Sequence, residues 1–299
     1  MFVLLGSSGQ ITSQLAHHLL GAGHAVRIVG RHRTALASLE KAGAELAVGD
    51  PGDAAFLERA FVGATAAYTM TPPCYAEPVM RAAQDRIGSA IALALRKARV
   101  PRVVNLSSVG AELAEGTGPI AGLHAQEQRL SGLPDVLHLR PGSFMENHLA
   151  ALQPVAASGV LPGLESAEAT IPLVATKDIA AVAARELTHP ARSGVLILHS
   201  ARLATPRDVA AVLGEAIGRP DLAYVQVPAE TMKAVLLEQG FSSDAADQLE
   251  ALARWLSTSP LDSVAAAPAE VQPTTLEMFA RDIFAPAYRQ LKAAETSAA

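Results

Sequence analysis

Short apolar runs alternate with segments of helical periodicity through the first half of the chain. The runs carry few polar residues on either face, as expected of parallel strands that are covered by helices on both sides. They lie at Met1–Leu5, Ala25–Val29, Glu45–Val48, Ala66–Thr69, Arg102–Leu106 and Asp135–Arg140. Helical spacing between the runs is clearest for Ile11, Leu15 and Leu19. After the last run, Pro141–Asn147 is expected to turn into a helix that reaches about Ala157. The alternation predicts an α/β fold built on a doubly wound parallel sheet.

The second half of the chain has a less regular pattern, which predicts a second, smaller α/β lobe. Its expected helices and strands occupy Lys177–Thr188, Val195–His199, Val209–Ile217, Ala223–Val227, Pro228–Gly240, Ser243–Leu256 and Thr274–Leu291. Thr205 opens a Thr-Pro-Arg-Asp segment, which is typical of a capped helix start. Residues 265–273 are interpreted as a loop. We therefore expect a core of residues 1–157 and a lobe formed mainly by 158–299, with 170–200 returning to the core.

The turn after the first strand has the composition of a phosphate-binding loop, Gly6-Ser7-Ser8-Gly9-Gln10-Ile11-Thr12. Gly6 permits a tight reversal, and Gly9 lets a pyrophosphate approach the backbone. The N–H groups of Gln10 and Ile11 begin a helix whose positive end attracts phosphate, and the two serine hydroxyls are further donors. Thr12 takes the place of a third glycine, so we expect a slightly displaced helix or a local bond from its hydroxyl. The turn predicts a Rossmann-like dinucleotide site.

Two arginines, Arg31 and Arg33, follow the second strand and favour NADP over NAD. NAD sites commonly carry an acidic residue here that binds the ribose 2′-hydroxyl, whereas NADP sites carry cations for the 2′-phosphate. One well-placed arginine contributes roughly 1.5–3 kcal/mol through a charge-assisted hydrogen bond. The alternative is a solvated loop in which the two charges contact nothing.

Residues at other strand ends are expected to border the same crevice. Asp50 is placed to accept a hydrogen bond from the adenine amino group, and equally to cap the helix expected near 53–61. Thr71 and Pro72 follow the fourth strand, and Ser107 follows the fifth. We expect these residues to line the dinucleotide site.

Composition and charge exclude several other classes of protein. Half of the residues are apolar and only 4% are aromatic, so the core is aliphatic. The net charge of −5 and the lack of a basic stripe argue against direct nucleic-acid binding. Cys74, the single cysteine, excludes an internal disulfide and a zinc site of paired thiolates, and we expect no metal. The apolar runs are too short for a membrane span or a signal peptide, so we expect a cytoplasmic protein.

Six motifs are dispersed over nearly the whole chain: Gly6-Ser-Ser-Gly9, Val48-Gly-Asp50, Ser107-Ser108, Leu139-Arg-Pro-Gly-Ser-Phe-Met-Glu-Asn147, Lys177-Asp-Ile-Ala180 and Thr275-Leu-Glu-Met-Phe-Ala-Arg281. In this order and spacing they resemble the NmrA-like family, atypical relatives of the short-chain dehydrogenases/reductases. The resemblance implies NAD(P) bound to a Rossmann-like domain, with a smaller lobe over the nicotinamide end. Members of the family include quinone and isoflavone-type reductases, and also regulators that bind the dinucleotide without turning it over.

The Tyr-x-x-x-Lys pair that many short-chain dehydrogenases use for proton transfer is missing. The corresponding segment reads Gly122-Leu-His124-Ala-Gln-Glu127-Gln-Arg129. His124 is the candidate catalytic residue, because an ordinary histidine pKa of about 6.5 suits proton transfer near neutrality. The alternatives for His124 are a hydrogen bond to a ribose or a helix cap. A quinone acceptor needs no such group, since solvent can protonate the reduced oxygen.

Phe144, Met145 and Asn147 are candidate substrate-binding residues, because they combine apolar surface with an amide. The alternative for these three is interdomain packing. Glu146 is interpreted as solvated, and Trp255 as lobe core or an oligomer contact.

Taken together, the residues and the resemblance predict an NADP(H)-binding reductase that transfers hydride to a small apolar carbonyl or quinone. The alternative is a nonenzymatic NADP(H)-sensing protein that acts through a protein partner. A homodimer is compatible with either function, and we expect neither nucleic acid nor a membrane as a partner.

Overall fold

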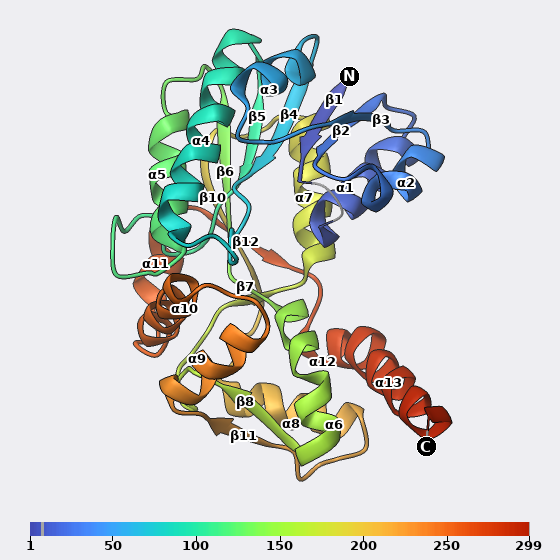
Figure 1. Cartoon of the computed structure of the whole chain (residues 1–299), viewed down its shortest axis with the longest axis vertical. Helices are drawn as coiled ribbons and strands as arrows, with labels where there is room; N and C mark the ends of the chain where they lie inside the picture. The colour runs from blue at the N-terminus through green and yellow to red at the C-terminus, as the bar shows by residue number, and fades with distance from the viewer. Residues whose placement is uncertain (7–8, 299) are drawn as a thin grey trace.

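The computed structural model describes residues 1–6 and 9–298. Its elements follow the predicted alternation of strands and helices (Figure 1). The strands are β1 Phe2–Leu5, β2 Val26–Gly30, β3 Glu45–Val48, β4 Ala66–Met70, β5 Val103–Leu106, β6 Val136–Pro141, β7 Ser143–Phe144, β8 Val160–Gly163, β9 Leu173–Val174, β10 Gly194–Ser200, β11 Ala223–Gln226 and β12 Ala269–Gln272. The helices are α1 Gln10–Gly21, α2 Arg33–Lys41, α3 Ala54–Phe61, α4 Met80–Lys97, α5 Ile120–Leu130, α6 Leu152–Ser158, α7 Thr176–Thr188, α8 Pro206–Ala216, α9 Ala229–Glu238, α10 Ser243–Leu256, α11 Leu261–Ala265, α12 Leu276–Phe279 and α13 Ala285–Ala298. A 3₁₀ helix at Met145–Ala151 and a π-helical segment at Ala280–Phe284 complete the order.

A single parallel sheet organises the core. Within the described residues it has eight strands in the order β12-β10-β6-β5-β4-β1-β2-β3, with every neighbouring pair parallel. The order reverses between β1 and β4, so a crevice is expected at the carboxyl ends of these two strands. The doubly wound α/β prediction is confirmed.

Helices cover both faces of the sheet, as the continuous apolar strands require. On one face α1, α2 and α7 contribute Leu15, Leu19, Leu36, Leu39, Ile179 and Ala183 to the core. On the other face α3, α4 and α5 contribute Leu57, Phe61, Ile87, Ile91, Leu95 and Leu130. Figure 1 shows these two layers on either side of the strands.

The lobe lies beyond the carboxyl ends of the strands (Figure 1) and has its own apolar cluster. Two short parallel pairs, β8 with β11 and β7 with β9, support it. Thr205 caps α8 and forms a reciprocal capping box with Asp208, which confirms the predicted helix start. The helices predicted at 228–240 and 243–256 are present as α9 and α10.

Three predicted elements differ from the structure. Residues 269–272, interpreted as a loop, form β12 at the edge of the main sheet beside β10. The helix expected to follow the turn at 141–147 and to reach about residue 157 is regular only in α6, because β7 and a 3₁₀ helix precede it; Pro154 lies in the first turn of α6, where no backbone donor is needed. The segment predicted as one helix at 274–291 contains a π-helical turn between α12 and α13. Thus α7, β10 and β12 all belong to the core although they follow lobe segments in the chain.

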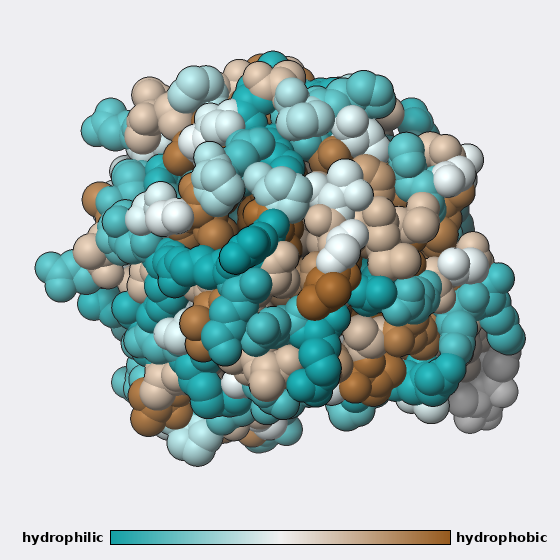
Figure 2. All heavy atoms as spheres, turned by 90° about the horizontal axis from the view of Figure 1, so that it is seen from above, coloured by the Kyte–Doolittle hydropathy of each residue, from teal (hydrophilic) through white to brown (hydrophobic). Residues whose placement is uncertain are grey.

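The end of the molecule at which β1 begins mixes hydrophilic and apolar side chains (Figure 2). Hydrophilic residues predominate there, with apolar ones interspersed, as for a solvent-facing surface. Among the helices of residues 1–6 and 9–298, none is both long and apolar enough to cross a membrane.

Glu270 ties the edge strand β12 to α7 and predicts a pH-dependent stability. Its carboxylate accepts hydrogen bonds from Arg185 at 2.9 and 3.0 Å and from Arg192 at 2.7 Å. These bonds, with that of Arg185 the largest, lower the pKa of Glu270 to about 2. The folded-state pKa lies below the unfolded one, so the stabilisation is present above about pH 4.5 and is lost as the pH falls toward 2.

We expect Glu270→Gln to lower the free energy of unfolding by about 1–2 kcal/mol at pH 7, a value kept small by solvent screening of this partly exposed cluster. Urea unfolding at several pH values measures the difference, which should shrink below pH 4.5. The control is Glu168→Gln, since the pair of Glu168 with Arg207 is exposed on both sides. A Glu270→Gln difference that stays constant between pH 7 and 3 would contradict the assignment.

Candidate functional site

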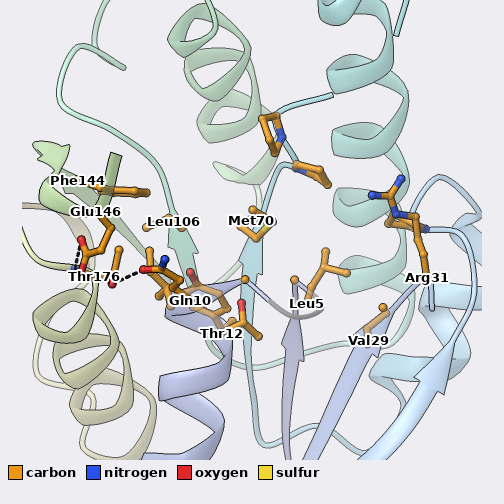
Figure 3. A pocket seen from close by; sticks show the side chains of 18 of the residues that line it. Leu5, Gln10, Thr12, Val29, Arg31, Met70, Leu106, Phe144, Glu146 and Thr176 are labelled. Carbon is orange, nitrogen blue, oxygen red and sulfur yellow. Dashed lines mark hydrogen bonds between the residues drawn. The ribbon is translucent and has the colours of Figure 1, made fainter. Parts of the chain in front are cut away.

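A cavity of about 420 Å³ lies along the carboxyl ends of β1, β2, β4 and β5. We call it the strand-end cavity. Figure 3 shows Arg31 at one end of it and Phe144 and Glu146 at the other, with Met70 and Leu106 between them. Its further lining residues are Leu5, Gly6, Gly9, Gln10, Ile11, Thr12, Val29, Gly30, Pro51, Tyr68, Pro72, Pro73, Asn147 and Thr176. Among the described lining residues, one cation, Arg31, and one carboxylate, Glu146, lie at opposite ends of the cavity.

The glycine turn at this cavity has the conformation that its sequence demands. Gly6 has φ +131°, and a Cβ there would lie 2.7 Å from Thr12 Oγ1 and 3.1 Å from Met70 Cγ. A side chain at Gly6 is therefore excluded both by strain and by space. Thr12 is buried against this glycine, in the position where a third glycine is usual.

The N-terminus of α1 opens into the strand-end cavity. Gly9 is the extended N-cap residue, and the first turn of the helix carries no acidic side chain. The free N–H groups and the positive end of the helix dipole therefore attract negative charge. Gly9, Gln10 and Ile11 line the cavity, and their contact with a dinucleotide stays a prediction, whereas Ser7 and Ser8 lie outside the described residues.

The two arginines after β2 have different surroundings. Arg31 lines the strand-end cavity. Arg33 is the first residue of α2 and pairs with Glu40 of the same helix, and it is not among the described lining residues. The structure therefore brings only Arg31 to the cavity.

Asp50 lies beside the cavity but does not cap α3. Its Oδ1 accepts from Gly52 N at 2.8 Å, and its Oδ2 lies 3.5 Å from Arg86 Nη1. Asp53 caps α3 by accepting from two backbone N–H groups. The helix-cap alternative for Asp50 is thus wrong, and an adenine contact stays a prediction, with the neighbouring Pro51 in the cavity wall.

A second cavity, of about 290 Å³, lies between the core and the lobe. We call it the interlobe cavity. It shares Met70, Pro73, Leu106, Phe144 and Asn147 with the strand-end cavity. Its other described residues are Thr71, Tyr75, Gln84, Ser107, Ser108, Val109, Pro119, Ile120, Leu123, Gly142, Ser143, Pro172, Leu252, Trp255 and Leu256. None of these described residues carries a charge.

Helix α10 closes the interlobe cavity from the lobe side. Asp244 Oδ2 accepts from Met80 N at 2.8 Å, so the start of α10 is fixed to the start of α4. Trp255, farther along α10, packs over Gly110, where a Cβ would lie 2.5 Å from the indole ring. Trp255 therefore forms part of the wall of the interlobe cavity. The sequence-based interpretation of Trp255 as lobe core or an oligomer contact did not include this position.

A buried charge network lies under one wall of the interlobe cavity. Ser107 Oγ donates to Glu127 Oε1 at 2.5 Å. Arg140 donates to both oxygens of Glu127, at 2.9 and 2.7 Å, and to Glu112 at 3.0 Å. Burial alone would lower the pKa of Arg140, but its bonds to Glu127 outweigh burial and raise it. The hydroxyl hydrogen of Ser107 is therefore used in the bond to Glu127. The Ser107 oxygen can still accept a hydrogen bond from another group.

Glu146 joins the 3₁₀ helix to the start of α7 at the end of the strand-end cavity near Phe144. Both carboxylate oxygens accept from Thr176 N at 3.0 Å, and Oε1 also accepts from Thr176 Oγ1 at 2.6 Å. Gln10 Oε1 lies 3.3 Å from the same hydroxyl (Figure 3). The interpretation of Glu146 as a solvated residue is wrong, because the N-terminus of α7 favours a carboxylate at this place.

The remaining predicted site residues divide between the cavities and the protein interior. Phe144 and Asn147 line both cavities, Pro72 lines the strand-end cavity, and Thr71 and Ser107 line the interlobe cavity. Met145 is fully buried in the apolar cluster of the lobe. Met145 is therefore a packing residue of the lobe and is not among the described residues that line either cavity.

His124 lies on α5, next to the cavity residue Leu123. Its Nδ1 is 2.9 Å from the carbonyl oxygen of Ala111. Because a carbonyl can only accept, Nδ1 carries the hydrogen. His124 is not among the described residues that line either cavity. Leu123, and not the candidate His124, therefore lines the interlobe cavity.

Two buried hydroxyls at the cavities lack hydrogen-bond partners among the described residues. They are the hydroxyl of Tyr68, in the strand-end cavity, and Oγ1 of Thr71, in the interlobe cavity. Burial raises the pKa of Tyr68, so this hydroxyl stays protonated. Since buried polar atoms are usually satisfied, both positions fit a ligand that carries polar atoms.

Comparisons with known proteins agree with this geometry. The model of the NmrA-like family matches residues 2–280. A (4-alkanoyl-5-oxo-2,5-dihydrofuran-3-yl)methyl phosphate reductase from Streptomyces griseus subsp. griseus is 30% identical over 224 residues, which cover 74% of this chain and 75% of that protein.

Two solved structures share the fold. An NADPH-dependent quinone oxidoreductase from Escherichia coli, complexed with NADPH, has a TM-score of 0.77 and 22% identity, over 95% of this chain and all of that one. A triphenylmethane reductase from Citrobacter sp., complexed with NADP(H), has a TM-score of 0.73 and 20% identity, over 97% of this chain and 99% of that one. At these identities the likeness concerns the fold alone.

Proposed function

The chain belongs to the NmrA-like family, and from this membership and the two joined cavities we propose that it is an NADP(H)-dependent reductase of a small, neutral quinone or carbonyl compound. The observation that carries the proposal is that the two cavities share part of their wall, including Phe144 and Asn147. A dinucleotide in the strand-end cavity would have its nicotinamide beside the interlobe cavity. The 30% identical relative is itself named as a reductase, which supports reduction over sensing alone.

The strand-end cavity fits the dinucleotide part by part. The pyrophosphate would lie at the N-terminus of α1, where Gly6 and Gly9 leave the backbone accessible. Arg31 would hold the 2′-phosphate at one end of the cavity. Glu146 and Asn147 would lie near the nicotinamide end, where Glu146 holds the start of α7 through Thr176.

The interlobe cavity fits an uncharged, largely apolar acceptor. Its described wall combines Trp255, Leu252, Leu123 and Phe144 with a few neutral polar groups. An anionic acceptor would lose its hydration there without gaining a cation. The Streptomyces relative is named for a phosphate ester, whereas this wall supplies no cation for a phosphate among the described residues.

The described residues orient the acceptor and exclude water, and the described wall of the interlobe cavity holds no histidine, lysine or carboxyl group to supply the proton. When bound, the nicotinamide supplies hydride, that is, two electrons and one hydrogen. The Ser107 hydroxyl already donates to the carboxylate of Glu127, and Leu123, not the neighbouring His124, lines the wall. We propose that solvent protonates the reduced oxygen, which favours quinones over simple ketones as acceptors.

The experiment follows NADPH absorbance with a panel of quinones and aldehydes. We expect turnover of quinones, and a fall of about tenfold in kcat/KM for Trp255→Ala, because the acceptor loses contact with the indole. His124→Ala is the matched variant outside the cavity wall and should keep most of the activity. Tight NADPH binding without turnover of any acceptor would contradict the reductase and favour the sensing function.

A further inference from the structure

The lobe contains a third cavity, of about 200 Å³, that the proposed reaction does not use. We call it the lobe cavity. Its described wall includes the aliphatic side chains of Leu161, Ile171, Leu173, Ala204 and Val209. These side chains belong to the apolar cluster of the lobe. A cavity with such walls favours a hydrocarbon group.

The lobe cavity adjoins the two cavities of the proposed active site. Ser143 and Asn147 line both the lobe cavity and the interlobe cavity. Asn147 also lines the strand-end cavity, so all three cavities meet at this residue. A molecule whose ring lies in the interlobe cavity can therefore extend past Asn147 into the lobe.

One polar atom at the lobe cavity lacks a partner. His148 lines the cavity, and its Nε2 is buried without a hydrogen bond to any described residue. Burial lowers the pKa of His148 to about 4, so the imidazole is neutral near pH 7. A neutral imidazole nitrogen bonds a neutral hydroxyl or carbonyl group.

The other polar groups of this wall do not favour an anion. The hydroxyl of Tyr224 already donates to the carbonyl oxygen of Glu165 at 2.7 Å. Glu165 itself is acidic, and the described lining residues include no lysine or arginine. A carboxylate or phosphate in the lobe cavity would thus be unpaired.

We propose that the lobe cavity is a subsite for an aliphatic chain carried by the acceptor, and that His148 Nε2 bonds a neutral oxygen on that chain. The acceptor is then a ring compound with a medium-length alkyl or acyl substituent. That the ring of this compound is reduced rests on the proposed function. Binding of its aliphatic chain in the lobe cavity does not.

The test titrates a series of n-alkanols, from butanol to octanol, into the NADPH-loaded protein by calorimetry. These probes cannot accept hydride from NADPH. We expect the affinity to rise about fourfold with each added methylene and to level off once the cavity is filled. His148→Leu should weaken every alkanol by about the same factor and keep the dependence on chain length.

Two variants that fill the cavity, Ala204→Leu and Val209→Phe, are expected to abolish the dependence on chain length. Ala211→Phe, on the exposed side of α8, is the matched control. Thermal unfolding shows whether each variant folds. If one of the two does not fold, the alkanol titration of the other tests the subsite. Affinity that does not depend on chain length, or is unchanged in a folded variant with a filled cavity, would overturn the subsite.

Turnover separates the subsite from the proposed function. We expect Val209→Phe to raise KM for a quinone with a hexyl chain and to leave that of unsubstituted benzoquinone unchanged. If alkanols bind with the expected dependence on chain length but no quinone is reduced, the reductase proposal fails and the subsite stands. If quinones are reduced with no preference for a chain in any variant, the subsite fails and the reductase stands.

Discussion

Replacing Arg31 with alanine is expected to raise the dissociation constant for NADPH by about 10- to 150-fold, while that for NADH changes little. The charge-assisted bond of an arginine to a phosphate contributes roughly 1.5–3 kcal/mol, and only NADPH carries the 2′-phosphate. Arg31 lies in the wall of the strand-end cavity, at the end remote from Phe144. Fluorescence titration with the two dinucleotides measures both constants.

Arg33→Ala is the matched control for Arg31→Ala. It removes the same charge two residues away, but its guanidinium is paired with Glu40 outside the described cavity wall. We expect its effect on NADPH binding to be less than threefold. Equal affinity of the unmodified protein for NADPH and NADH would reject the assignment of Arg31 to the 2′-phosphate.

Glu127→Ala is expected to lower the free energy of unfolding by about 3 kcal/mol. The substitution leaves Arg140 buried with a single remaining carboxylate partner, Glu112, and removes the acceptor of the Ser107 hydroxyl. Breaking a buried ion pair from one side costs about 3–5 kcal/mol, and the remaining bond to Glu112 keeps the loss near the lower end. Urea unfolding at pH 7 measures the change.

The double variant Glu127→Leu/Arg140→Met separates an unpaired charge from lost packing. Replacing both partners by apolar groups of similar size should recover most of the lost stability, because no charge is left buried alone. Glu112→Ala should cost less than Glu127→Ala, since Glu112 is more exposed and makes one of the three bonds of Arg140. A double variant no more stable than Glu127→Ala would contradict the electrostatic explanation.

The core was largely predictable because its strands carry a strong local pattern. A central parallel strand such as β1 is apolar on both faces, and the glycine turn after it has few other interpretations. The edge strand β12 was missed for the opposite reason. Ala269–Gln272 has one paired neighbour and a mostly solvent-facing surface, so its residues are mixed in polarity and resemble a loop. Its pairing depends on β10, which no local pattern reveals.

The candidate site was predictable where it depends on the turns of the sheet, and not where distant segments meet. Gly6, Gly9 and Arg31 follow strands, so their position at the crevice could be inferred from the order of elements. Trp255 and Glu146 could not be placed in this way. Helical spacing indicates that one face of α10 is buried but does not identify its partner, and the carboxylate of Glu146 depends on the start of α7, thirty residues later in the chain.

The edge strand β12 also has a consequence for how such enzymes could be recombined. The chain leaves the sheet after β6, builds part of the lobe, returns for α7 and β10, leaves again, and returns for β12. A cut at residue 157 would therefore remove two strands from the sheet along with the lobe. The lobe cannot be exchanged between relatives as one continuous segment, and a change to the wall of the interlobe cavity has to come from replacing individual segments such as α10 in an otherwise intact chain.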